Sequence, residues 1–129
     1  MAGWKTFEEI GAWQRARELK LLVLDFVARP PVARDFKYRD QIRDAARSAQ
    51  SNIAEGFARF KHKEFTQFAR VAKGSEAEVL NHFIDAVDSG YMTKGEFPQY
   101  EHAVKKALKA VNGLIRHLES TPDPPPAKR

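Results

Sequence analysis

Apolar side chains recur along most of the chain at the spacing of one helix face. The pattern predicts four helices, over about residues 9–28, 35–59, 63–89 and 96–119. In the first and last of them the intervals alternate between four and three residues, at Ala12, Ala16, Leu19, Val23 and Phe26 and at Val104, Leu108, Val111, Ile115 and Leu118. No segment alternates apolar and polar residues as a half-buried strand does. The chain is therefore predicted to be all-α.

Residues near the predicted helix ends suit their positions. Thr6 and Glu9 have the spacing of a capping box ahead of the first helix. Pro30–Pro31 is expected to end that helix, because proline cannot continue it. Gly90 is expected to cap the third helix, and Pro98 is tolerated in the first turn of the fourth.

The short connections between these helices predict how they pack. Four amphipathic helices joined by short turns form an antiparallel up-down-up-down four-helix bundle. We expect a single domain over residues 1–121, in keeping with a chain of 129 residues. Residues 122–129 are rich in proline and lack the apolar side chains of a packed segment, so this tail is expected to be disordered.

The second predicted helix carries three kinds of stripe. Its apolar stripe is Ile42, Ala46, Ala49, Ile53 and Phe57. One flank holds an arginine stripe of Arg39, Arg43 and Arg47, four residues apart. The other flank holds a polar seam of small or uncharged side chains bordered by a glutamate: Gln41, Ser48, Asn52, Glu55 and Gly56.

Two interpretations of the polar seam stay open. Its small side chains allow another helix to come close and to hydrogen-bond across the contact, which makes self-association plausible. The favoured interpretation is that Ser48, Asn52 and Glu55 satisfy partners inside the bundle. Gly74 in the third helix costs about 1 kcal/mol against alanine, so it predicts the close approach of a neighbouring backbone. Ser75 beside it is interpreted as a packing position.

The net charge of +5 is confined to one part of the chain. Residues 1–28 and 64–129 each hold equal numbers of acidic and basic side chains. The basic segment, residues 29–63, holds nine basic side chains against four acidic ones. Such a concentration of positive charge is typical of a protein that binds a polyanion. An ordinary solvated helix face is the alternative.

The basic segment indicates how a nucleic acid would be held. Lys61 and Lys63 extend the positive charge past Arg59. Pairs that Asp40 and Asp44 form with neighbouring arginines at helical spacing contribute only about a few tenths of a kcal/mol, so they leave the excess charge in place. No aromatic side chain is evidently interleaved with these charges on an exposed face, so no base-stacking platform is predicted. We expect phosphate contacts to dominate.

Several kinds of chemistry have no signature in the sequence. There is no cysteine, and the four histidines are scattered, so no metal site and no cofactor are predicted. The Glu-x-x-His motif of di-iron bundles is missing, as are phosphate loops and nucleophile elbows. No catalytic residue is predicted, and the protein is expected not to be an enzyme. Neither a signal peptide nor a membrane-spanning run is evident, so a cytoplasmic location is expected.

Several short motifs over residues 7–92 resemble one protein family. They are Trp13 and Ala16, Gln41-Ile-Arg43, Asn52-Ile-Ala-Glu-Gly56, Lys63-Glu-Phe65, Ala72-Lys-Gly-Ser75, Glu78 and Gly90-Tyr91. In this order and spacing they resemble the four-helix bundle proteins encoded in intervening sequences of 23S ribosomal RNA genes, the S23 ribosomal protein family. That family is similar to the accessory variability determinant of diversity-generating retroelements.

The resemblance implies an assembly and a binding role. It implies a homopentameric barrel whose basic surface binds RNA or DNA and, in the retroelement relatives, docks a reverse transcriptase. No catalytic residue comes with the family. We transfer the binding role to Arg39, Arg43, Arg47 and Arg59. The chain departs from the family near Lys61, where relatives carry a serine or threonine that caps the third helix. Losing that cap costs up to about 1 kcal/mol. Two explanations stay open: a bound polyanion offsets this cost, or the change is sequence drift.

The leading hypothesis is therefore a non-enzymatic, oligomeric adaptor that binds nucleic acid through phosphate contacts from the second helix and the turn after it. One alternative is a scaffold that binds only protein, with the basic face against an acidic partner. Another is a mobile-element passenger without a ligand.

Overall fold

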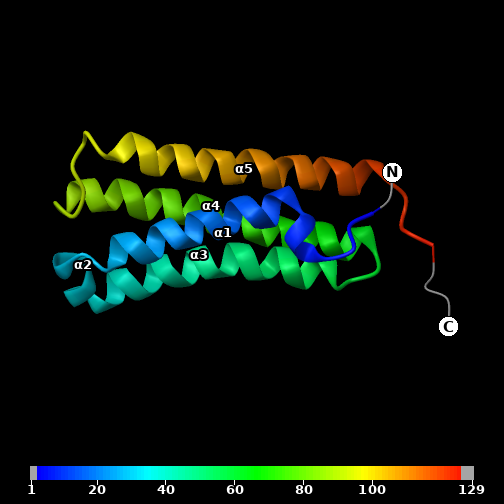
Figure 1. Ribbon diagram of the computed structural model, residues 1–129, viewed down its shortest axis with the longest axis horizontal. Helices are drawn as coiled ribbons and strands as arrows, with labels where there is room; N and C mark the ends of the chain where they lie inside the picture. Colours follow the sequence, from blue (N-terminus) through cyan, green and yellow to red (C-terminus); the bar gives the residue numbers. More distant parts are fainter. Residues whose placement is uncertain (1–2, 126–129) are drawn as a thin grey trace.

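The computed structural model describes residues 3–125 and is all-α over that range. A short 3-10 turn, η1 (Phe7–Glu9), precedes α1 (Gly11–Val27) and the one-turn α2 (Pro30–Arg34). Three long helices follow, α3 (Phe36–Phe57), α4 (His62–Asp88) and α5 (Phe97–Ser120). The prediction of four long helices is confirmed, and the boundaries lie close to the predicted ones (Figure 1).

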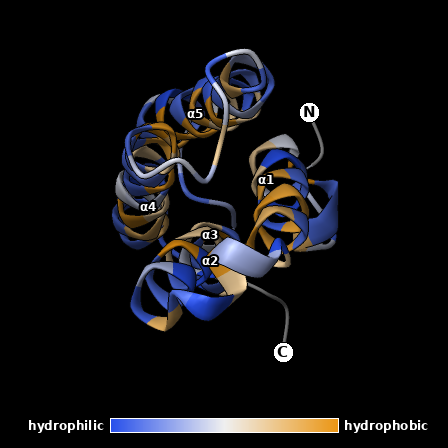
Figure 2. Ribbon diagram, turned by 90° about the vertical axis from the view of Figure 1, so that its left-hand side faces the viewer, coloured by the Kyte–Doolittle hydropathy of each residue, from blue (hydrophilic) through white to orange (hydrophobic). Residues whose placement is uncertain are grey.

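The four long helices form a bundle whose members alternate in direction (Figure 1). Going round the bundle, α1 packs against α3, α3 against α4, α4 against α5, and α5 against α1. Figure 2 looks along the bundle and shows this ring, with much of the apolar colour turned inward. One end carries α2 and the connection between α4 and α5. The other end carries the α3–α4 turn together with the first and last residues that the structure describes.

The helix ends follow the predicted chemistry with one exception. Gly90 has φ of +78° just beyond α4, and the N–H of Tyr91 bonds back to the Ala86 carbonyl at 2.8 Å. Pro98 lies in the first turn of α5. The exception is the short α2, which was not predicted: α1 ends at Val27, before Pro30–Pro31 as expected, and these prolines then begin α2. Proline suits this place because the first helical N–H groups have no partner within the helix.

Two apolar clusters fill the interior. The α2-end cluster includes Leu19, Val23, Phe26, Ile42, Val79, Phe83 and Val104. The tail-end cluster includes Ile10, Ala16, Ala49, Ile53, Phe65, Ala72, Val111 and Leu118. Most of the predicted inward positions are buried, which confirms the helical periodicity.

Glu76 stands where the two clusters meet. On the inward face of α4 it lies between Ala72 of the tail-end cluster and Val79 of the α2-end cluster. Its side chain is 0% exposed, and neither carboxylate oxygen has a hydrogen-bond partner among the described residues. Burial raises the pKa of Glu76 to about 8, because the charged form loses its hydration.

None of the helices in the described part of the chain is long and apolar enough to cross a membrane.

Candidate nucleic-acid interface

The first two members of the arginine stripe share one carboxylate. Arg39 Nε and Arg43 NH2 each lie 2.9 Å from the same oxygen, Oδ1 of Asp40. The arginine side chains are 28% and 30% exposed, and that of Asp40 is 46% exposed. One negative charge therefore faces two positive ones at the surface, and this group keeps a net positive charge. Pairs this exposed contribute only about 0–1 kcal/mol.

Arg47 differs from its two neighbours. It is exposed, and among residues 3–125 it forms no ion pair and no side-chain hydrogen bond. The pair with Asp44 that helical spacing allows is not formed. Arg47 therefore carries the least neutralised positive charge of the arginine stripe.

The α3–α4 turn carries the other predicted cations. Arg59 pairs with Glu55 at 3.0 Å, and its guanidinium lies over the ring of Phe68, 4.9 Å from the ring centroid. Lys61 Nζ is 3.8 Å from the Asp123 carboxylate, a loose pair at the surface. Lys63 is exposed and, within the described residues, makes no ion pair. The turn brings these positive charges together at the tail end of the bundle.

Aromatic side chains accompany the basic residues, and the expectation that none is interleaved with them was wrong. Phe36 is 65% exposed, and the Arg39 guanidinium lies 4.9 Å from its ring centroid. Phe60 is 42% exposed, with Lys61 Nζ 5.4 Å from its ring centroid. The sequence did hold a signal, since Phe60 stands directly between Arg59 and Lys61. Phe36 offered a second signal, because it does not belong to the apolar stripe of its helix and was therefore free to be exposed.

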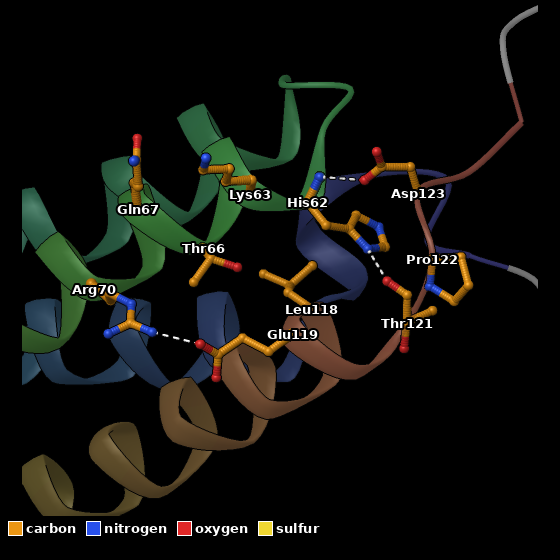
Figure 3. Close-up of a pocket in the computed structure, with 10 residues that line it drawn as sticks. All are labelled: His62, Lys63, Thr66, Gln67, Arg70, Leu118, Glu119, Thr121, Pro122 and Asp123. Carbon is orange, nitrogen blue, oxygen red and sulfur yellow. Dashed lines mark hydrogen bonds and ion pairs between the residues drawn. The ribbon is translucent and has the colours of Figure 1, made fainter.

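The N-terminus of α4 is capped by the tail. Lys61 precedes the helix, and its side chain forms no capping hydrogen bond. Instead the His62 backbone N–H donates to Asp123 Oδ1 at 2.8 Å, across 61 residues of sequence (Figure 3). His62 Nδ1 also lies 2.9 Å from the Thr121 carbonyl oxygen. The cap that the sequence lacks at position 61 is thus supplied from within the chain and needs no external anion.

The hydrogen bond between His62 and Asp123 involves the tail, residues 122–129, which was expected to be disordered. Residues 122–125 have no regular secondary structure, yet Asp123 among them is hydrogen-bonded to α4. Residues 126–129 lie outside the described range.

A groove of about 620 Å³ separates the start of α4 from the end of α5 (Figure 3). Its lining includes the basic side chains Lys63 and Arg70 and the acidic side chains Glu119 and Asp123. Arg70 pairs with Glu119 across it at 2.6 Å. Because these charges balance, the groove itself adds little to the positive surface beside it.

Part of the polar seam faces the neighbouring helix of the same bundle. Ser75 Oγ on α4 donates to Ser48 Oγ on α3 at 2.9 Å. Asn52 Nδ2 donates to the same hydroxyl at 3.0 Å and to the Ser48 carbonyl at 2.8 Å. These bonds agree with the favoured interpretation for Ser48 and Asn52, whose partners lie within the bundle.

Of the remaining seam residues, one is buried and the others are exposed. Gly56 is buried, and a Cβ atom built on it would lie 2.6 Å from Phe65 Cδ1, so the close approach of α3 and α4 depends on this glycine. Gly74 is exposed, and an added Cβ would meet nothing within 4 Å. The prediction of a backbone of this chain close to Gly74 was therefore wrong. Gln41 and Glu55 are exposed, and Glu55 is engaged by Arg59 rather than by a buried partner.

Comparison with known families decides the classification. The family model described as 23S rRNA-intervening sequence protein matches residues 8–113. The chain belongs to this family. The matched region contains the arginine stripe, the α3–α4 turn and the polar seam, and it ends before the tail that caps α4. No curated protein matches the chain significantly.

Proposed function

We propose that this protein is a non-enzymatic, oligomeric adaptor that binds nucleic acid through phosphate contacts. The contacts come from the outer flank of α3 and from the α3–α4 turn, through Arg39, Arg43, Arg47, Arg59, Lys61 and Lys63. The observation that carries the proposal is the confinement of the net charge of +5 to residues 29–63, with Arg47 and Lys63 exposed and without ion pairs in the described chain.

The pairs that Arg39 and Arg43 make with Asp40 do not oppose this role. Both arginines remain partly exposed, and a single carboxylate cannot neutralise both of them. A surface pair of this kind stabilises the fold by less than a phosphate contact gains through the release of counterions. An incoming phosphate is therefore able to take over one guanidinium while Asp40 keeps the other.

Assembly and protein partners belong to the proposal through the family resemblance. The related accessory proteins of retroelements support a pentameric ring that brings five copies of the basic segment together and docks a reverse transcriptase. Repetition of one weak cationic surface in a ring raises the overall affinity through effective concentration. Light scattering with and without RNA tests the assembly and its response to a polyanion together.

Charge reversal tests the binding surface. The triple variant Arg39→Glu, Arg43→Glu, Arg47→Glu is expected to lower the affinity for labelled RNA or DNA at least about a hundredfold, because it replaces several phosphate contacts with repulsion. A matched control reverses three exposed lysines on α5, Lys105, Lys106 and Lys109, which changes the net charge by the same amount. The control is expected to weaken binding only a few-fold.

Two results would remove the proposal. One is wild-type affinity in the arginine variant while its melting temperature is unchanged. The other is an equal loss in the α5 control, which would show that net charge alone drives association. Recovery of one protein partner after nuclease treatment, with no binding of nucleic acid, would favour a protein scaffold instead.

A further inference from the structure

We infer that the ligand is single-stranded nucleic acid, whose unpaired bases stack on the exposed rings of Phe36 and Phe60. This inference rests on the proposed function and narrows it to a class of ligand. A surface that contacts phosphates alone accepts single strands and duplexes alike, whereas exposed rings add a contact that only unpaired bases satisfy.

The first observation is which apolar side chains the bundle leaves in water. The large hydrophobic residues exposed in the described chain are Leu21, Phe36, Phe60, Val71 and Ile84. The two aromatic ones, Phe36 and Phe60, both fall within residues 29–63, where the excess positive charge resides. The three aliphatic ones lie outside that segment. Exposed aromatic rings and excess positive charge thus occur together in the sequence.

The second observation is the contact between each ring and a cation. The Arg39 guanidinium lies 4.9 Å from the Phe36 centroid, and Lys61 Nζ lies 5.4 Å from the Phe60 centroid. Both distances are within the range of a cation–π contact. Each contact positions a ring beside a positive charge without burying it, since Phe36 stays 65% and Phe60 42% exposed. A base that stacks on such a ring brings its own phosphate close to the same cation.

The third observation is the order of these groups along α3. Phe36 is the first residue of this helix, and Arg43 and Arg47 follow it by seven and eleven residues, which places all three on one face. Phe60 comes three residues after the end of the helix at Phe57. The 22 residues of α3 rise about 33 Å, so the two rings lie near opposite ends of this helix, with Arg39, Arg43 and Arg47 in a row after Phe36 and with Arg59 and Lys61 on either side of Phe60. A flexible single strand can follow such a row, and a duplex keeps its bases inside its own stack.

The experiment compares one RNA in two states. Fluorescence anisotropy measures binding of the full-length protein to a labelled mixed-sequence RNA of about 20 nucleotides, alone and annealed to its complement. The variants are Phe36→Ala and Phe60→Ala. Each is expected to weaken binding of the single strand by about fivefold or more and to leave duplex binding within about twofold of wild type. Phe36→Trp, which keeps a ring, is expected to retain single-strand affinity.

Val71→Ala and Ile84→Ala are the matched controls. They remove apolar side chains from α4 that are 52% and 46% exposed and lie outside the basic segment. They are expected to leave single-strand binding unchanged. Because all four positions are exposed, melting temperatures close to wild type would show that the fold is intact in every variant.

The outcomes separate this inference from the proposed function. If both alanine variants bind the single strand as wild type does, while reversal of the arginine stripe abolishes binding, the stacking role is overturned and phosphate binding stands. If the alanine variants lost the same affinity for the single strand as for the duplex, the stacking role would also be overturned. Failure of the wild-type protein to bind RNA in either state would overturn both.

Discussion

Two cations from opposite ends of the bundle, Arg29 and Lys63, use their positive charges differently. At the α2 end, Arg29 is drawn into the fold: its guanidinium donates to the Glu96 carboxylate, to the Tyr91 carbonyl at 3.1 Å and to the Tyr100 hydroxyl at 3.0 Å. It also lies over the Phe26 ring, 5.2 Å from the centroid. At the tail end, Lys63 is exposed and Lys61 makes only a loose pair.

This difference shows that formal charge alone does not locate a binding surface. Arg29 and Lys63 both belong to the basic segment, and each adds one charge to the excess. The Arg29 guanidinium donates its hydrogen bonds to α5 and to the loop before it. It therefore links helices, and few of its N–H groups remain for a ligand. The cations that stay available are those of α3 and of the α3–α4 turn. Substitutions that separate stability from binding test this division.

The largest expected effect comes from Glu76, where the two apolar clusters meet. Burial raises the pKa of Glu76 from 4.5 to about 8, so the folded protein keeps it protonated at a pH where the unfolded chain ionises it. Its contribution to stability is therefore fully present below pH 4.5 and is lost as the pH rises through about 8. Glu76→Gln mimics the protonated form at every pH. The variant is expected to be more stable than wild type by several kcal/mol at pH 9 and nearly equal at pH 5, on the order of 1.4 kcal/mol per pH unit between.

Urea unfolding of wild type and Glu76→Gln across this pH range measures the difference. A constant difference in the free energy of unfolding would mean that Glu76 does not titrate between the folded and unfolded states. Glu64→Gln on α4, an exposed carboxylate without an ion pair among the described residues, is the matched control, with no pH-dependent gain expected.

The next effect concerns Arg29 at the α2 end. Arg29→Met is expected to lower the free energy of unfolding by about 1–3 kcal/mol, because it leaves the partly buried partners of the guanidinium without a donor. RNA affinity is expected to stay within about twofold of wild type. Urea unfolding and anisotropy measure the two quantities. A large loss of RNA affinity in a folded Arg29→Met protein would erase the distinction between Arg29 and Lys63.

Acid titration sharpens this test at the same contact. The hydrogen bond from Arg29 lowers the pKa of Glu96 to about 2, with further support from the Thr93 N–H at 2.8 Å. Glu96 therefore contributes stability that is present above pH 4.5 and is lost as the pH falls towards 2. In Arg29→Met, the free energy of unfolding is expected to depend less on pH between 4.5 and 2 than it does in wild type. The same loss of stability at acid pH in the variant and in wild type would show that Arg29 is not the main cause of the lowered pKa of Glu96.

A smaller effect is expected at the tail end, where Asp123 caps α4. Asp123→Ala removes the acceptor of the His62 N–H and is expected to cost about 0.5–1.5 kcal/mol. Asp123→Asn keeps a capping oxygen and loses only the loose pair with Lys61, so it is expected to behave nearly as wild type. Hydrogen exchange of the His62 amide reports the cap directly. Equal protection of this amide in wild type and Asp123→Ala would show that the tail does not hold the helix end in solution.

The smallest effect on stability is expected at Lys63. Lys63→Met makes the same kind of change as Arg29→Met on an exposed side chain without an ion pair in the described chain, so stability is expected to shift by less than about 0.5 kcal/mol. RNA affinity is expected to fall several-fold through the loss of a phosphate contact. A destabilisation as large as that of Arg29→Met would contradict the view that the turn cations are free for a ligand.

The sequence predicted the bundle because its inward positions follow a strict helical period. Ala12, Leu19 and Val23 on α1, like Val104 and Val111 on α5, are buried as the ladders require. Glu76 was not predicted to be inward, although it lies four residues after Ala72 and three before Val79, because a carboxylate does not count as an apolar position. It also gave no account of the short α2.

The candidate site was predicted less completely, because its details depend on contacts across the chain. Helical spacing located the arginine stripe but did not show that Arg39 and Arg43 share Asp40. The cap from Asp123 joins residues 61 positions apart, and no local pattern predicts such a bond. Phe60 was visible between two basic residues, but its exposure depends on how the turn meets α4.

The central claim is that the outward cations of residues 29–63 hold phosphates. The slope of log affinity against log salt concentration for single-stranded RNA tests it most directly. Wild type is predicted to show a linear fall, and Arg47→Gln with Lys63→Gln is predicted to make the slope shallower by about 0.7 for each phosphate contact removed. A wild-type slope near zero, or the same slope in both proteins, would contradict the account.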